Sequence, residues 1–225
     1  MNVKQINTIN NYSIKKKGVK MVKYDFKKEK KNLYYPSEKK VSIVDVPRMN
    51  FLMVDGIGDP NTSMEYQNAM EALFPTSFKT KFLSKKENNQ DYVVMPLEGL
   101  WWADNMEEFS IEDKESWKWT AMIMQPELVT EEMIKKAMED VESKKNPVSL
   151  SKVRFEKFSE RLSAQIMHIG PYGAAEAPTV AKLHDFIEKS GYKIRDKHHE
   201  IYISDVRRTK PERLKTVIRQ PIEQK

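Results

Sequence analysis

The chain has 225 residues, enough for one domain with a substantial core, and it contains no cysteine. Disulfides, thiolate metal sites and cysteine nucleophiles are therefore excluded, and the composition fits a reducing compartment. No apolar run reaches the roughly 18 residues of a membrane span, and no secretory signal is visible. We therefore expect a cytoplasmic protein with no membrane partner.

The net charge of +6 comes from the start of the chain. Residues 1–40 contain 12 lysines and three acidic residues, a net charge of +9, whereas residues 41–225 carry 27 basic and 30 acidic side chains, a net charge of −3. The body therefore lacks the basic surface that nucleic acid requires, and no nucleic-acid partner is expected. Residues 1–24 are predicted to be a disordered basic extension, for which a nucleic-acid-binding arm is the alternative, and residues 25–225 a single domain.

Alternating apolar residues predict four strands in the first half of the chain, with one helix between the second and the third. These strands are Val41–Val46, Asn50–Asp55, Val93–Trp102 and Ser116–Gln125. Asn61 or Thr62 is expected to cap the helix, Thr62 together with Glu65 as a capping box. Pro75 is expected to kink or end the helix, with a shorter helix to about Ser84 after it. The loop Gly56–Asn61 lacks the third glycine and the lysine of phosphate-binding fingerprints, so no nucleotide cofactor is expected.

The second half repeats this order after a connecting helix at about 130–145. Its predicted elements are the strands Lys152–Phe158, Arg161–Ile169, His199–Ile203 and Leu214–Pro221, and the helix Ala175–Ser190. The two repeats, at about 41–126 and 152–222, both follow the order β-β-α-β-β. We predict an α+β fold in which duplicated β-β-α-β-β units form an antiparallel sheet with helices on one face. A ligand cleft is expected at the pseudo-two-fold, on the opposite, concave face.

The stretch Leu97-Glu-Gly-Leu-Trp-Trp102 places one carboxylate beside two indoles. Burial beside aromatic rings tends to raise the pKa of a carboxylate, which suits it to acid–base chemistry. Glu98 and Glu200 occupy matching strands of the two repeats, so we expect both to enter the cleft, from opposite sides. The alternative is an edge strand with tryptophan in the core and Glu98 in solvent.

Several other residues leave two interpretations open. His198 and Glu200 would share a strand face and could bind a metal, but no third ligand is near in sequence, so no metal is expected. His168 precedes a turn and is either a hydrogen-bonded structural residue or part of the site. Tyr66 belongs either to the core or to the cleft lining. The thirteen methionines either fill the core or give the pocket plasticity.

Six segments together resemble the GyrI-like small-molecule-binding proteins, from about Met21 to the C-terminus. They are Val44-Asp-Val-Pro47, Met53-Val-Asp-Gly56, Gly58-Asp-Pro-Asn61, Leu97-Glu-Gly-Leu-Trp-Trp102, His168-Ile-Gly-Pro-Tyr172 and His199-Glu-Ile-Tyr-Ile-Ser-Asp205. The resemblance implies the duplicated unit, which is shared with the effector-binding domains of multidrug-responsive transcription regulators. Nothing in the chain resembles a helix-turn-helix, which argues against a role as a transcription factor.

Family relatives bind bulky aromatic or cationic compounds between the repeats, with a glutamate at the base of the cleft. Stand-alone members similar to this chain are associated with hydrolysis of cyclopropane-bearing DNA-alkylating natural products. The resemblance therefore implies detoxification by a hydrolase without a cofactor. The alternative is sequestration or effector binding without chemistry, with a protein partner such as DNA gyrase. The candidate catalytic residues are Glu98, Glu200 and Tyr202, and the candidate ligand-binding residues are Trp101, Trp102, Tyr66, Tyr172 and His168.

Overall fold

The computed structural model describes residues 22–104 and 114–225. Most of the predicted basic extension, residues 1–21, lies outside the described residues. The last part of that extension, Val22–Tyr24, forms strand β1, which pairs in parallel with β4 (Gln90–Tyr92), so this part of the prediction is wrong. Among the helices of the described residues, none is both long and apolar enough to cross a membrane.

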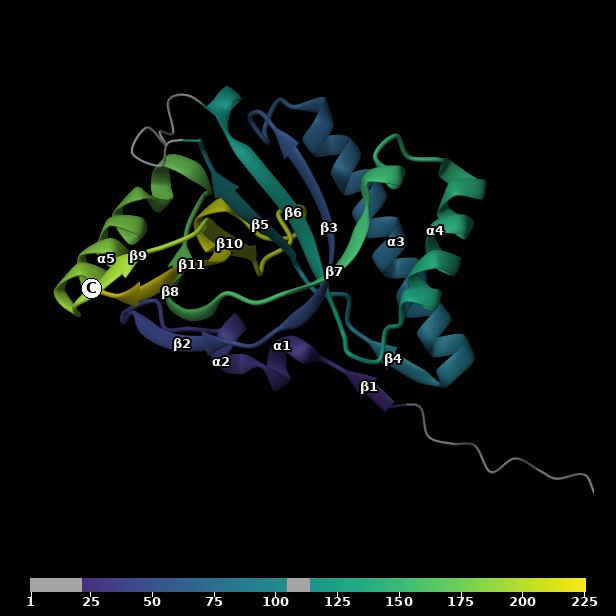
Figure 1. Ribbon diagram of the computed structural model, residues 1–225, viewed down its shortest axis with the longest axis horizontal. Helices are drawn as coiled ribbons and strands as arrows, with labels where there is room; N and C mark the ends of the chain where they lie inside the picture. Colours follow the sequence, from purple (N-terminus) through teal and green to yellow (C-terminus); the bar gives the residue numbers. More distant parts are fainter. Residues whose placement is uncertain (1–21, 105–113) are drawn as a thin grey trace, which may run out of the picture.

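Two β-β-α-β-β units make up most of the molecule (Figure 1). The first contains β2 (Ser42–Val46), β3 (Met49–Ile57), α3 (Met64–Asn88), β5 (Leu97–Trp102) and β6 (Lys118–Gln125). The second contains β7 (Arg154–Phe158), β8 (Arg161–Ile169), α5 (Ala177–Lys189), β10 (His198–Tyr202) and β11 (Lys215–Gln224). Outside this pattern lie α1 (Phe26–Glu29), α2 (Lys31–Tyr34), the connecting helix α4 (Glu131–Lys145) and β9 (Tyr192–Ile194).

The strands form one antiparallel sheet in the order β2-β8-β11-β10-β5-β6-β3-β7, with β9 beside β11. The first strand of each unit pairs with the second strand of the other unit, β2 with β8 and β7 with β3. At the centre, β10 and β5 join the two units, and Glu200 lies opposite Gly99. The predicted α+β fold with a duplicated unit is therefore confirmed, and the exchange of first strands ties the units together.

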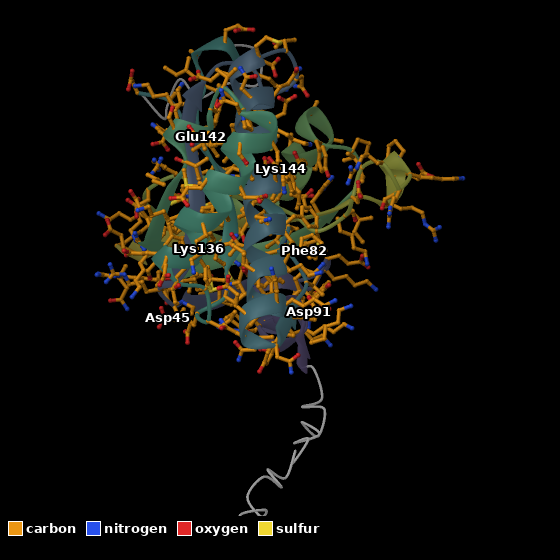
Figure 2. The ribbon with its side chains drawn as sticks, turned by 90° about the vertical axis from the view of Figure 1, so that its right-hand side faces the viewer. Asp45, Phe82, Asp91, Lys136, Glu142 and Lys144 are labelled. Carbon is orange, nitrogen blue, oxygen red and sulfur yellow. The ribbon has the colours of Figure 1, made fainter. Side chains whose placement is uncertain are left out.

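Both main helices cover the same face of the sheet. The ring of Tyr66 on α3 lies 5.9 Å from that of Trp101 and 5.0 Å from that of Trp119, and these two tryptophans are paired across β5 and β6. Leu183 of α5 packs in a cluster with Ile218, which lies opposite Glu200. Directly opposite residues point to the same face, so α3 and α5 share the face of Trp101 and Glu200. Helix α4 packs on the outer side of α3, so α3 lies between α4 and the sheet (Figures 1 and 2).

Helix α3 differs from the prediction in two places. The helix runs without interruption through Pro75. The proline lacks a backbone N–H, but packing of the buried face of α3 keeps the helix intact. Two buried threonines on this face, Thr76 and Thr80, donate hydrogen bonds of 2.8 Å to backbone carbonyls one turn earlier. The N-cap is Ser63, and not Asn61 or Thr62, and its hydroxyl accepts a hydrogen bond from the backbone N–H of Tyr66.

Gly56 is needed where β3 faces the buried ring of Trp119. A Cβ at residue 56 would lie well inside van der Waals contact with the far ring of that indole. Because Trp119 is fully buried, it has no room to move aside, and we expect Gly56→Ala to destabilise the fold by about 1–3 kcal/mol. Urea denaturation would measure this, with Ile57→Ala at the neighbouring exposed position as the control that changes stability by less than about 0.5 kcal/mol.

Candidate functional site

A cleft of about 720 Å³ opens where the two units meet. Its walls come from α3, from β5 and from the end of β10 with the loop after it. The predicted cleft at the junction is present, but it lies on the face that carries the helices and not on the opposite face. The side chains that define its chemistry are Tyr66, Trp101, Lys114, Trp117, Tyr172, Glu176, Glu200 and Tyr202.

Glu200 enters the cleft from the central strand β10. The hydroxyl of Tyr202 donates a 2.7 Å hydrogen bond to Oε2, and Nε2 of His198 lies 3.3 Å from Oε1. Burial alone would raise the pKa of this carboxyl, but the contacts with His198 and Tyr202 outweigh it and hold the pKa below its ordinary value. Glu200 is therefore a carboxylate at neutral pH, fixed on both oxygens.

Glu176 is a second carboxyl group in the cleft, which the sequence analysis missed. It ends the short 3-10 turn Gly173–Glu176 before α5, and the backbone N–H of Gly173 donates a 2.7 Å hydrogen bond to its Oε2. Burial, and then the negative charge of Glu200, raise its pKa to about 8. The burial of Glu176 was difficult to predict from the sequence, since a glutamate at the start of a helix is usually exposed.

Three tyrosines surround the two carboxyl groups. Burial and the charge of Glu200 raise the pKa of Tyr66 and of Tyr202, and burial with the charge of Glu176 raises that of Tyr172 to about 12. All three phenols therefore remain protonated and can donate hydrogen bonds. Tyr66 is both packed against the core and part of the cleft lining, so the two interpretations of this residue hold together.

Glu98 is not in the cleft, and the expectation that it faces Glu200 is wrong. It lies opposite Ile201 across the β5–β10 pair, whereas Glu200 lies opposite Gly99. Because neighbouring residues of a strand point to opposite faces, the two glutamates lie on opposite sides of the sheet. Glu98 is fully buried there, 3.1 Å from the hydroxyl of Tyr34 and 3.2 Å from Nε2 of His199.

The same alternation of side chains along β5 places Trp102 outside the cleft. Trp101 lines the cleft, whereas Trp102 points to the far face, where Nζ of Lys197 lies 3.2 Å from the centre of its ring. Trp117, just before β6, provides the second indole of the cleft, at a ring distance of 5.7 Å from Trp101. The regular alternation of β5, with no bulge at Gly99, is the reason that the two adjacent indoles separate.

His168 stabilises the structure next to the cleft, but it is not one of the residues that line the cleft. Its Nδ1 lies 2.9 Å from the hydroxyl of Thr179 on α5, and its Nε2 lies 3.2 Å from the carbonyl oxygen of Pro171. Both ring nitrogens are thus engaged, which ties the end of β8 to the turn that leads to Glu176. His168 was predicted to bind the ligand, but it is not among the residues that line the cleft, and the structural interpretation fits its geometry.

The far face of the sheet holds a buried ionic cluster, formed by Glu98, Glu160, His199 and Arg219. His199 lies between two carboxylates, with Nδ1 2.9 Å from Oε1 of Glu160 and Nε2 close to Glu98. NH1 of Arg219 lies 2.9 Å from Oε2 of Glu160. His198 and His199 therefore lie on opposite faces of the sheet, and His198 is the one that lies beside Glu200, the other residue of the metal interpretation.

An α+β protein with two β-β-α-β-β units and an aromatic cleft at their junction is by class a protein that binds small molecules. The chain belongs to the GyrI-like small molecule binding domain family, whose model matches residues 39–223. No curated protein matches it.

Solved structures agree with this assignment. The chain is 41% identical to an uncharacterized conserved protein from Listeria innocua, over 88% of this chain and 99% of that one, with a TM-score of 0.82. A protein from Listeria innocua described as a hydrolase is also 41% identical, over 90% and 100% of the two chains, with a TM-score of 0.80. The C-terminal domain of EcmrR shares the fold, with a TM-score of 0.52 at 12% identity over 83% and 98%.

Proposed function

We propose that the protein binds flat, bulky aromatic electrophiles in the cleft and opens an activated cyclopropane with water. The observation that carries this proposal is the pair Glu176 and Glu200, two carboxyl groups in one aromatic cleft whose pKa values are moved in opposite directions. Two carboxyl groups held in different protonation states are suited to act as acid and base in one reaction. The similarity to a relative described as a hydrolase, together with the family resemblance, supports chemistry over binding alone.

The chemistry divides between the two groups. The carboxylate of Glu200 accepts a proton from water as the water oxygen forms a bond to a ring carbon of a cyclopropane conjugated to a dienone. The ring C–C bond breaks, and its electron pair moves through the dienone to the carbonyl oxygen, which becomes a phenolate. Glu176, protonated at neutral pH, donates its proton to that oxygen, and the hydroxyls of Tyr66 and Tyr172 stabilise the developing charge. The product is a phenol that carries an alcohol.

The stoichiometry of the reaction tests this proposal. A cyclopropane-fused dienone is incubated with one-hundredth of an equivalent of protein, and the ring-opened alcohol is quantified by chromatography. We expect many equivalents of alcohol per protein, above the rate in buffer. Loss of no more than one equivalent of free compound would mean sequestration, and would overturn the proposed hydrolysis.

The pH profile of turnover is expected to be bell-shaped. Glu200 must be ionised and Glu176 protonated, so kcat should fall in acid, below the ordinary range of a glutamate, and again in alkali around pH 8. We expect Glu176→Gln to lower kcat and to abolish the alkaline fall, because an amide does not titrate. An alkaline limb that persists unchanged in this variant would assign the acid to another group.

A further inference from the structure

Lys114 places a positively charged group in the cleft that carries Glu176 and Glu200. Its side chain lines the cleft beside Trp117, and Nζ lies 5.5 Å from the centre of that indole. A lysine ammonium over an indole ring is held there by cation–π attraction. The side chain is half-buried, so its ammonium belongs to the lining of the cleft.

The ammonium lies next to the turn that holds Glu176. A Cβ on Gly173 would lie 3.6 Å from Nζ of Lys114, and the backbone N–H of Gly173 donates the 2.7 Å hydrogen bond to Oε2 of Glu176. Burial and the charge of Glu200 raise the pKa of the Glu176 carboxyl, and the charge of Lys114 acts against them. The cation and the protonated carboxyl group are therefore neighbours at one residue of the turn before α5.

The charge of Lys114 is open to a ligand. The next lysine along the chain, Lys118, forms an ion pair with Asp104 on the far face, whereas Lys114 has no ion-pair partner within residues 22–104 and 114–225. A fixed cation in a cleft can stabilise a negative charge that develops there during a reaction. A charged donor also binds an oxyanion more strongly than the neutral hydroxyl of a tyrosine does.

We propose that Lys114 is a catalytic residue that stabilises the negative charge on the carbonyl oxygen as the cyclopropane ring opens. This inference rests on the proposed function for the reaction itself. The ring C–C bond breaks, and its electron pair moves to that oxygen while Glu176 delivers a proton there. Lys114 keeps its own protons and contributes only its charge, so the two residues have different roles in one step.

Removal of the charge separates this role from a structural one. Lys114→Met should lower kcat by roughly 10²-fold, the lower end of the loss for one oxyanion donor, and Lys114→Arg should keep most of the activity because it keeps the cation. The alkaline fall of kcat should move to higher pH in Lys114→Met, because Glu176 loses a positive neighbour. Lys145→Met is the matched control, since Lys145 is exposed at the end of α4 and does not line the cleft. Equal kcat values and pH profiles in Lys114→Met and Lys145→Met would overturn the proposal.

A bound phenol tests the charge of Lys114 without any reaction. The probe is the ring-opened alcohol of a cyclopropane-fused dienone, whose phenol is titrated by absorbance in the presence of saturating protein. We expect the phenol to ionise at a pH at least about one pH unit lower on the wild-type protein than on Lys114→Met. Ionisation at the same pH on both proteins would overturn the role of Lys114. Absence of turnover in the wild-type protein would overturn the proposed hydrolysis, and this titration would then still decide whether Lys114 stabilises an oxyanion in the cleft.

Discussion

Replacement of Glu200 by glutamine is expected to lower kcat by a factor of about 10²–10⁴, the usual contribution of a general base. Glutamine keeps the volume of the side chain and can still accept a hydrogen bond from Tyr202, so the cleft should retain its shape. What it cannot do is take a proton from water. Steady-state formation of the ring-opened alcohol is the measurement, and binding of that alcohol should change by far less than kcat.

Glu139→Gln provides the matched control for this variant. Glu139 is exposed on α4, which packs against α3 and does not line the cleft, so the same chemical change there should leave both kcat and binding unaltered. If Glu200→Gln kept full turnover while Glu176→Gln lost it, the roles of base and acid would have to be reassigned. If both variants kept full turnover, the proposed mechanism would be wrong.

The duplicated order of elements was predictable because its signals are local. Alternation in strands, helical spacing around Leu183 and cap residues such as Thr130, which caps α4, depend on neighbours within a few residues. The exchange of β2 and β7 between the units depends on pairing between strands far apart in the chain. No local pattern contains that information, so the sheet order could not be predicted.

The candidate site was predicted in part, and the error at Glu98 has a physical cause in the strand register. Glu200, Tyr202 and Trp101 lie in the cleft, but Glu98 does not, because its register places it opposite Ile201. A shift of one residue in register turns a side chain to the other face, and the sequence does not fix the register between β5 and β10. Matching strands in the two repeats therefore did not guarantee matching faces.

Glu98 belongs instead to the buried ionic cluster. Within this cluster, the largest effect on stability is expected from replacement of Arg219. We expect Arg219→Met to destabilise the fold by about 3–5 kcal/mol, because it leaves the carboxylate of Glu160 buried with one cation fewer. The side chains of Arg219 and Glu160 are only 1% and 2% exposed. Arg219 also donates hydrogen bonds to Gln165 and to the carbonyl oxygen of Leu33, which methionine cannot replace.

The dependence of stability on pH should report the same cluster. Burial would raise the pKa of Glu160, but His199 and Arg219 outweigh it and lower the pKa to about 2. Since this folded value is below that of the unfolded chain, the contribution is complete above about pH 4.3 and is lost as the pH falls toward 2. The pKa of His199 shifts in the opposite direction, because the two carboxylates raise it against the effect of burial. Its contribution is complete below about pH 6.5 and is lost as the pH rises through the raised value.

Urea denaturation of three variants would separate the buried pair from a general effect of losing an arginine. Arg207→Met is the matched control, since Arg207 is 84% exposed beside Asp205 and should contribute little to stability. The double variant Glu160→Gln with Arg219→Met should recover part of the loss, because it removes the unpaired charge as well as its partner. A loss from Arg219→Met no larger than that from Arg207→Met would mean that the cluster does not stabilise the face of the sheet behind the cleft.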